Sequence, residues 1–497
     1  MSSRRDFLRF GLGLVGTAGL TGPAAFLCNK TAHGSTGSGI PGTRGISPYG
    51  PISPVRDSAT GLFLLALPRG FSYQSLSWKG DVLDDGNIVA SGHDGMAVVS
   101  ESGGRSPTFT LIRNHEVFGL GTPIASDFNY DSRGPGGTTM LRWRAGRLLE
   151  SVVNISGTSS NCAGGYTPWG TWLTCEEGVD VGDQKHGYIF ECAPGRVTSP
   201  VPLVSMGRLP HEAIAIDPDT GFVYETEDNG SSRSGQRGLS GFYQFRPNNA
   251  GGGIGSLAAG GELYMLQAKL DGTPVADLRR CVQGAVYDCA WIRIDNPDAD
   301  PSNNASGPYN QGIAGGATRF QRLEGCWWSY KEDAVYFVDT EAGPIGAQPG
   351  SSNRAEGAVW RYIPSTGKLT CIFVSQGALH PTVYGADNPD NIVVSPKGGL
   401  LMQEDGGKND GDGLSLLGLL PSGLSYEFAR NNISIGATDA PKLVAAGHNP
   451  AAVGTGDFTG QEFAGATFDS SGRYLFVNVQ TPGITFVITG PWKKGNL

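Results

Sequence analysis

The sequence predicts an all-β protein, organised as a single large β-propeller of roughly six blades with loop insertions. Two observations predict this fold: glycine occupies 77 of the 497 positions, and short alternating apolar runs recur between turn residues. Glycine supplies the positive φ angles that tight turns require, and alternation with a period of two is typical of half-buried strands. Repeated strand units of this kind favour a propeller, because the chain is unusually long for the alternative, a β-sandwich.

The composition and charge limit the classes of function. Charged residues make up 17% of the chain, apolar residues 39%, and the formal net charge is −9. The 9 Trp, 16 Tyr and 21 Phe residues suffice for a large core, which argues against disorder. The sequence contains no cluster of Lys and Arg of the kind that binds nucleic acid. After residue 27 no apolar stretch approaches the roughly 18 residues of a membrane span, so we expect no stable membrane anchor.

The first 30 residues have the features of an export signal. Arg4 and Arg5 are followed by Phe7-Leu8 and by the short, glycine-rich apolar run 10–20. Paired arginines before such a run indicate a twin-arginine signal peptide, so the twin-arginine translocase is an expected partner during export. We therefore expect a periplasmic or extracellular protein with a signal peptide over 1–30, a linker over 31–55 and a propeller domain over 56–497.

Four hairpins repeat the same arrangement of apolar strands and polar ends. They are predicted over residues 213–224, 327–338, 392–402 and 466–477. In each, a polar residue enters the first strand and an acid or amide leaves the second. A there-and-back strand pair returns to the end it left, so both polar residues are expected at the same rim. The bracketing pairs are Glu212 and Glu227, Glu324 and Asp339, Asn391 and Glu404, and Glu462 and Asn478.

Acidic residues at strand ends are the main candidates for chemistry. One rim of every propeller blade converges on the central axis, so carboxylates from distant positions can meet there. Like charges gathered in this way are costly unless a cation neutralises them. Hard oxygen ligands favour Ca²⁺ or Mg²⁺, and a thiolate beside them favours iron or zinc. Any one of these acids, taken alone, fits equally well as a solvated turn residue. The acids are Glu116, Glu176, Glu177, Glu212, Glu227, Asp228, Glu324, Asp339, Glu341, Glu404, Asp405 and Glu462.

A cysteine-rich segment adds a thiol to this pattern. Between residues 161 and 177 lie Cys162, Cys175, two tryptophans and the pair Glu176-Glu177. If processing removes Cys28, one of the eight cysteines, an odd number remains and at least one thiol stays unpaired. That thiol is either a buried free cysteine or a metal ligand.

A cation stands next to one of the candidate acids. Arg322 and Glu324 are two residues apart and so lie on the same face of a strand. An arginine beside a metal suits an anionic substrate, since its fork binds phosphate oxygens at two points, although an ordinary ion pair would look the same in sequence. The chain has no His-Glu-x-x-His motif, no Gly-x-Ser-x-Gly elbow and no phosphate-binding glycine loop, which disfavours zinc proteases, serine hydrolases and NTPases.

The order of several motifs resembles the PhoX-type alkaline phosphatases from about Leu67 to Trp492. The matching pieces are Leu67-Pro68-Arg69-Gly70-Phe71, His93-Asp94-Gly95-Met96-Ala97, Arg113-Asn114-His115-Glu116, Gly136-Gly137-Thr138-Thr139, the segment 161–177, His211-Glu212-Ala213, Glu227-Asp228, Gly241-Phe242-Tyr243, Asp390-Asn391 and Glu404-Asp405-Gly406. The chain departs from that family by being shorter between the Glu-Glu and His-Glu motifs. It also has Gly178 where the family usually has Asn, and Leu323 where the family has Pro.

The resemblance implies a monomeric, exported, six-bladed propeller that hydrolyses phosphate monoesters with Ca²⁺ and Fe³⁺ in its site. It implies that Cys162, Glu212 and Glu324 are metal ligands and that Arg322 binds the substrate phosphate, with Arg322 and Glu324 as the catalytic pair. It places the remaining expected metal ligands at Glu116, Glu176, Glu177, Glu404 and Asp405.

Two further functions remain open at this point. One is a non-catalytic, Ca²⁺-stabilised propeller whose rim binds partners or polysaccharide. The other is a Ca²⁺-dependent lactonase or phosphodiesterase, because a fold and a metal together do not determine the reaction.

Overall fold

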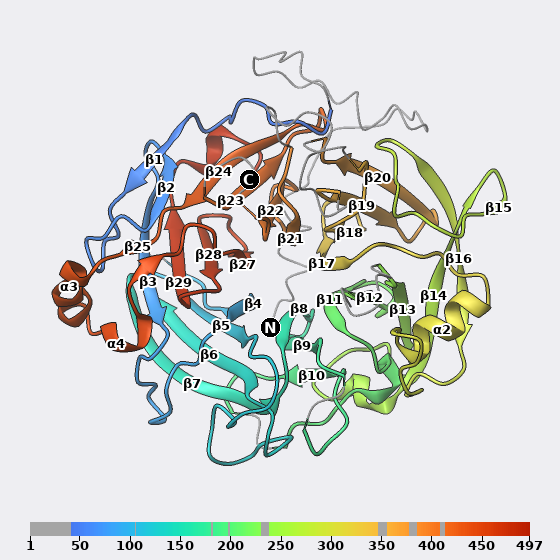
Figure 1. Ribbon diagram of the computed structural model, residues 1–497, viewed down its shortest axis with the longest axis horizontal. Helices are drawn as coiled ribbons and strands as arrows, with labels where there is room; N and C mark the ends of the chain where they lie inside the picture. Colours follow the sequence, from blue (N-terminus) through green and yellow to red (C-terminus); the bar gives the residue numbers. More distant parts are fainter. Residues whose placement is uncertain are drawn as a thin grey trace.

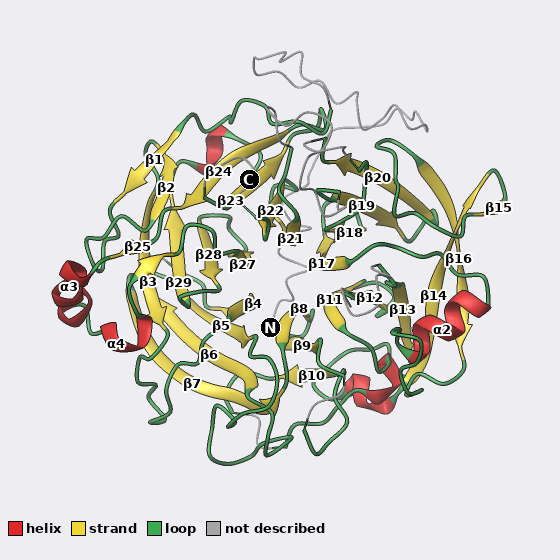
Figure 2. Cartoon of the chain, in the orientation of Figure 1, coloured by secondary structure: helices red, strands yellow, loops and turns green. Residues whose placement is uncertain are grey.

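A computed structural model describes residues 41–104, 106–179, 182–196, 199–229, 238–345, 355–376, 385–407 and 413–497. The signal peptide expected over 1–30 and the first part of the expected linker lie outside these residues. The described chain is a ring of antiparallel sheets around a central axis, with the few helices at the periphery (Figures 1 and 2). None of the helices in the described ranges is long and apolar enough to cross a membrane.

The innermost strands form a closed ring. Each contacts the next around the axis, and the last contacts the first. Over the described ranges this ring contains six strands, and the sheets that begin at them have the propeller-like arrangement that the sequence predicted (Figure 1). In ring order the strands are β4 (His93–Glu101), β8 (Asn161–Tyr166), β11 (His211–Ile216), β17 (Leu323–Ser329), β21 (Pro389–Val394) and β27 (Phe463–Phe468).

Each inner strand begins a blade, numbered 1 to 6 in ring order, whose further strands follow outward. They are β5 (Thr108–His115), β6 (Gly136–Arg144) and β7 (Arg147–Thr158) in blade 1; β9 (Trp172–Glu176) and β10 (Ile189–Cys192) in blade 2; β12 (Val223–Glu227), β13 (Phe242–Pro247), β14 (Gly261–Leu270) and β16 (Val286–Ile294) in blade 3; β18 (Ala334–Asp339), β19 (Ala358–Ile363) and β20 (Lys368–Val374) in blade 4; β22 (Leu400–Glu404), β23 (Ser415–Leu419), β24 (Ser425–Asn431), β2 (Leu65–Pro68) and β1 (Ile52–Val55) in blade 5; and β28 (Tyr474–Val479), β29 (Ile484–Thr489) and β3 (Ser72–Trp78) in blade 6.

The elements outside this scheme are short. Strand β15 (Thr273–Pro274) pairs with β14, and β25 (Ser434–Ile435) pairs with β26 (Gly456–Asp457). The helices are α2 (Gly307–Ala314), α3 (Ala440–Ala445) and α4 (Pro450–Val453). Helix α2 lies in the long connection between β16 and β17.

The two ends of the propeller domain close the ring together. Blade 6 takes three strands from the C-terminal part of the chain and its outermost strand, β3, from the N-terminal part. The segment expected to be a linker, 31–55, joins the sheet from residue 41 onward: Gly42 and Gly45 donate hydrogen bonds to blade 5, and β1 pairs with β2. These strands pair with an edge that would otherwise be open.

Every inner strand is irregular near its first residues. The register with the second strand shifts there in all six blades, as between His211 and Ile214 in β11. A β-bulge of this kind twists the strand and re-aims its side chains. Glycine follows the bulged position where inner strands nearly touch: a Cβ on Gly95 would lie 2.6 Å from Ala163 Cα, and one on Gly325 would lie 2.7 Å from Asn391 Cα. The first residues of the inner strands are thereby brought close to the axis.

Candidate metal centre at one mouth of the channel

Acidic side chains from five blades meet where the inner strands begin. Asp94 in β4, Glu116 after β5 and Glu462 before β27 each offer a carboxylate oxygen, and these oxygens lie within 4.8 Å of one another. We call these three residues the first carboxylate group. They come from blades 1 and 6, so the meeting depends on the closed ring.

A second carboxylate group has the same arrangement. Glu212 in β11, Glu324 in β17 and Asp390 in β21 offer oxygens within 4.8 Å of one another, each from a different blade. Each of these residues, like Asp94, is the second residue of its inner strand. The bulge at that position therefore explains why these four side chains reach the axis.

The acids that end the second strands accept hydrogen bonds from backbone N–H groups of nearby loops. Glu176 turns into its own blade, where its carboxylate accepts hydrogen bonds from the backbone N–H groups of Ser159, Gly187 and Tyr188 at 2.8–3.2 Å, with His186 Nδ1 at 2.7 Å. These bonds fix the loops around blade 2. The same kind of backbone N–H bond is made to Glu227 by Gly241, to Asp339 by Gln321 and Arg322, and to Glu404 by Asp387 and Ser415.

The next acid along the chain faces the centre instead. Burial, and after it the carboxylates of Glu116 and Asp228, raise the pKa of Glu177 well above its usual value. Burial and then Asp405 do the same to Glu462. Glu177, Asp228 and Asp405 therefore lie within electrostatic reach of the two carboxylate groups, one residue beyond the acids that hold the loops.

Electrostatic coupling between blades extends through the whole centre. Burial raises the pKa of Asp94, and Asp390, two blades away, adds to this more than any other charge. Burial and then Asp405 raise the pKa of Asp390 to about 6. Oδ1 of Asp94 is buried and has no hydrogen-bond partner in the described part of the chain. Such a set of buried, mutually repelling oxygens fits bound cations, which would reverse the direction of these shifts.

Arg322 is the cation beside the second carboxylate group. Its guanidinium forms a fork with Asp228, with Nε 2.8 Å from Oδ1 and a second bond to Oδ2, and its Nη2 lies 3.0 Å from Glu324 Oε1. Glu341 is at 3.8 Å. The Arg322 side chain is 25% exposed whereas Asp228 and Glu324 are 3% exposed, so a ligand arriving from solvent would meet the arginine.

Cys162 contributes a buried thiol to the same layer. It is the second residue of β8, the position that the four acids occupy in other blades. Its Sγ lies 3.2 Å from the carbonyl oxygen of His211. Burial, and after it Glu212, raise the pKa of the Cys162 thiol, so in the metal-free protein the protonated thiol donates to that carbonyl. Cys162 belongs to neither carboxylate group.

The structure distinguishes among the expected site residues. Glu116, Glu212 and Glu324 lie in the carboxylate groups, and Cys162, Arg322, Glu177 and Asp405 lie next to them. Glu176 and Glu404 face into their blades, because each lies opposite the first residue of its inner strand in the register.

Two residues of the centre, Asp94 and Asp390, were missing from the candidate acids. Glu462 was among the candidate acids but not among the ligands that the family resemblance implied. Asp94 and Asp390 stood within quoted motifs and could have been found by placing the starts of the inner strands side by side, since each occupies the second position.

Comparisons with known proteins agree with the fold. The family described as "Alkaline phosphatase PhoX" matches residues 122–483. The solved structure of Pseudomonas fluorescens PhoX in complex with vanadate, a transition state analogue, is 18% identical, covers 92% of this chain and 99% of that chain, and has a TM-score of 0.59. At that identity the likeness shows the fold.

Other solved structures are less similar. A gluconolactonase from Xanthomonas campestris is 12% identical, with coverage of 89% of this chain and 98% of that chain and a TM-score of 0.37. The pyranose dehydrogenase PQQ domain from Coprinopsis cinerea is 10% identical, with coverage of 86% and 97% and a TM-score of 0.40. No curated protein sequence matches the chain. Because the family match spans most of the sequence, the chain belongs to the alkaline phosphatase PhoX family, whose members are metal-dependent phosphatases.

Proposed function

We propose that this hydrolase is a phosphomonoesterase whose carboxylate-rich mouth binds a cluster of cations and whose Arg322 binds the phosphate of the substrate. The observation that carries the proposal is the presence of two carboxylate groups, which draw on five blades and each hold three carboxylate oxygens within 4.8 Å of one another, with one partly exposed arginine beside them. Neither a solvated turn nor an ordinary ion pair explains so many buried acids facing one axis.

The donor set supports calcium and iron as the cations. The first carboxylate group offers only hard oxygen atoms, which Ca²⁺ prefers. Cys162, close to Glu212, adds a soft sulfur ligand that suits Fe³⁺ better than calcium. When bound, the cations supply electrostatic stabilisation of the transition state and an activated oxygen nucleophile.

Arg322 is arranged to orient a phosphate. Arg322 Nε donates a hydrogen bond to Asp228 Oδ1, and Nη2 lies 3.0 Å from Glu324 Oε1. These contacts fix the plane of the guanidinium before a substrate arrives. Nη1 is the group that neither of these carboxylates uses, and it can donate a charge-assisted hydrogen bond to a phosphate oxygen. Because Glu324 also belongs to the second carboxylate group, the arginine is held at a constant position relative to the cations.

Export by the twin-arginine route to the periplasm or beyond, as a monomer, completes the proposal. It rests on Arg4 and Arg5, which precede the described residues. Replacing both arginines by lysine should retain the protein in the cytoplasm, and cell fractionation followed by immunoblotting would detect this. Processed protein in the periplasm of that variant would refute the route.

The direct test is an assay of metal-replete protein on a chromogenic phosphate monoester. We expect turnover that a strong chelator abolishes and that added Ca²⁺ and Fe³⁺ restore, with both metals found by elemental analysis. A phosphodiester and a lactone, assayed in parallel, separate the other hydrolytic activities. Absence of monoester turnover in protein that contains its metals would exclude the proposed activity.

A further inference from the structure

The opposite mouth of the channel holds a large cavity that the proposed function does not use. Its volume is about 1070 Å³. It is lined by the turns at which the inner strands of five blades end, over 99–104, 166–170, 327–331, 394–397 and 467–473. Since the carboxylate groups lie where those same strands begin, the cavity faces the other side of the propeller.

The cavity is closed toward the metal centre. Trp327 lines both this cavity and a void of about 10 Å³ further along the axis, which is at most the space of one water molecule. Gly95, Ala163, Ala213 and Gly465 are among the other residues that line the void. A ligand that enters the cavity therefore meets a floor and cannot reach the carboxylates through the axis.

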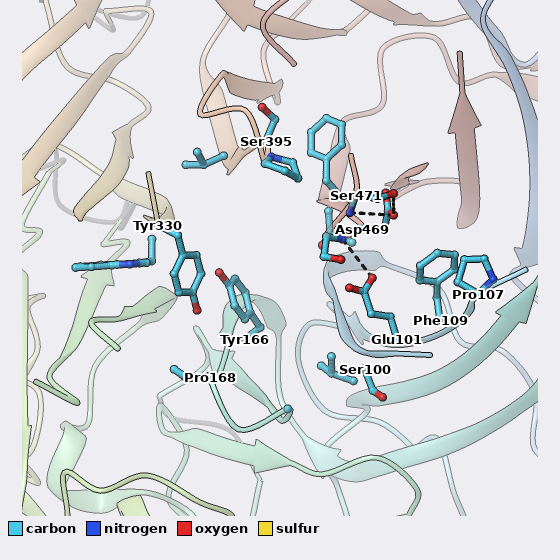
Figure 3. A pocket seen from close by; sticks show the side chains of 18 of the residues that line it. Ser100, Glu101, Pro107, Phe109, Tyr166, Pro168, Tyr330, Ser395, Asp469 and Ser471 are labelled. Atoms are coloured by element: carbon cyan, nitrogen blue, oxygen red, sulfur yellow. Dashed lines mark hydrogen bonds between the residues drawn. The ribbon is translucent and has the colours of Figure 1, made fainter. Parts of the chain in front are cut away.

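One wall of the cavity is aromatic. The ring of Tyr166 lies with its centroid 5.1 Å from that of Trp327 and 6.3 Å from that of Tyr330, and Tyr166 and Tyr330 stand on the same side in Figure 3. Trp169 is fixed by a 2.7 Å hydrogen bond from Nε1 to Glu191. These rings come from blades 2 and 4 and form a platform before any ligand binds.

The facing wall is polar and of mixed charge. Glu101, Asp469 and Ser471 lie together there, with Ser470 N–H donating to Glu101 Oε2 at 3.2 Å (Figure 3). Two nearby ammonium groups are directed to the backbone: Lys331 Nζ donates to the carbonyl of Lys397 at 2.7 Å, and Lys397 Nζ to that of Gly495 at 3.2 Å. The Asp469 carboxylate is satisfied by its own turn, where it accepts from the backbone N–H groups of Ser471, Arg473 and Tyr474. Glu101 and the hydroxyl groups of Ser100 and Ser102 are among the polar groups that the cavity offers to a ligand. The cation Arg473 also lines the cavity, and its Nε donates to Ser471 Oγ at 2.9 Å.

We propose that this cavity binds the end of a neutral oligosaccharide. The C–H face of a pyranose ring packs on aromatic rings, while its hydroxyl groups need donors and acceptors on the other side, as the two walls provide. A phosphate ester would require cations aimed into the cavity, whereas Lys331 and Lys397 are directed to carbonyl groups and Arg473 Nε to the hydroxyl of Ser471. A continuous polypeptide would require a groove that is open at both ends. This cavity is closed at its base by Trp327, so it suits the end of a chain instead.

The experiment titrates maltohexaose, cellohexaose and chitohexaose separately into the metal-replete protein by calorimetry. At least one should bind with a Kd below about 1 mM, and Tyr330→Ala should weaken that binding by at least about tenfold, or about 1.4 kcal/mol. Tyr330→Phe keeps the ring and should bind within about threefold of the wild type. Phe63→Ala, at an aromatic residue that is 44% exposed and outside the cavity, is the matched control and should leave Kd unchanged.

Three results would overturn the proposal. They are no binding of any of the three hexasaccharides at 10 mM, binding that Tyr330→Ala does not weaken in a variant with a normal melting curve, and displacement of the sugar by inorganic phosphate. Monoester turnover is measured on the same preparation, so a failure here is distinguishable from a failure of the proposed phosphatase function.

Discussion

The two mouths of the propeller channel are built from opposite ends of the same inner strands, yet their chemistry differs. At one mouth, acids from five blades form two groups of three, and the carboxylate oxygens of each group lie within 4.8 Å of one another. At the other, aromatic rings face polar side chains across a cavity of about 1070 Å³. Residues at equivalent positions of the inner strands are brought together at the axis of a propeller, because the inner strands of all blades meet there. The residue type at that position therefore decides the chemistry of each mouth.

The two mouths also differ in their effect on the stability of the folded protein. Burial and mutual repulsion raise the pKa values of the acids at the first mouth, so ionising them in the metal-free protein opposes folding. The aromatic mouth gains from ring packing and needs no ligand to be stable. Stability should therefore depend on bound cations at the acidic mouth only.

The largest effect is expected from removing one ligand charge at the acidic mouth. Glu212→Gln should lower monoester turnover by about a thousandfold or more, about 4 kcal/mol, because the second carboxylate group loses a negative oxygen ligand. Glu262→Gln, at an exposed carboxylate on outer strand β14, is the control and should retain turnover and metal content. Wild-type metal content and rate in Glu212→Gln would contradict the assignment of that group.

Arg322→Ala should have the next largest effect. Loss of a charge-assisted contact with phosphate should reduce kcat/KM by about a hundredfold, about 2.7 kcal/mol, while metal content stays the same. Arg293→Ala, at an outer arginine that is 61% exposed, serves as its control. A rate equal to that of the control would show that Arg322 is only a partner of Asp228.

Glu176 and Glu177 are adjacent, and substitutions there separate the acid that binds loop N–H groups from the acid that faces the metal centre. Glu176→Gln should lower the free energy of unfolding by about 2 kcal/mol, because a carboxamide cannot accept all the N–H bonds that the carboxylate accepts. Glu177→Gln should not destabilise the metal-free protein, since it removes a repelling charge, but it should reduce turnover. Urea denaturation in chelator, paired with the turnover assay, measures both; the opposite pattern would reverse the assignment of the two side chains.

The smallest effect concerns pH. The pKa of Asp390 is about 6 in the folded metal-free protein against 3.8 in the unfolded chain. A raised folded pKa means that the folded state holds more protons between these values. The stability contribution of Asp390 is thus complete below about pH 4 and is lost as the pH rises to about 6. Urea midpoints from pH 4 to 7 in chelator should show this fall, and metal-loaded protein should not. Parallel curves would indicate that the cations bind elsewhere.

Much of the architecture could be predicted from local patterns. The hairpins over 213–224, 327–338, 392–402 and 466–477 are present as β11–β12, β17–β18, β21–β22 and β27–β28. The pairing of Arg322 with Glu324 follows from their spacing along one strand and is also present. These features depend on residues close together in the chain, where strand period and turn type constrain the geometry.

The division of labour within each acid pair could not be predicted in this way. Glu176 and Glu177 are neighbours of the same type, and only the register of β9 with β8 decides which of them faces the axis. The cavity at the other mouth was missed for a related reason: Tyr166 and Tyr330 belong to turns of different blades, and nothing in either turn indicates that the other is near.

The sequence by itself determined that the chain folds into short paired strands, that acids stand at one rim of them, and that an arginine accompanies one acid. Only the tertiary structure decided which acids meet, because Asp94, Glu116 and Glu462 are brought together by closure of a ring whose first and last blades lie far apart in the chain. The physical reason is that periodicity constrains a residue relative to its own strand, whereas a cation site depends on distances between strands.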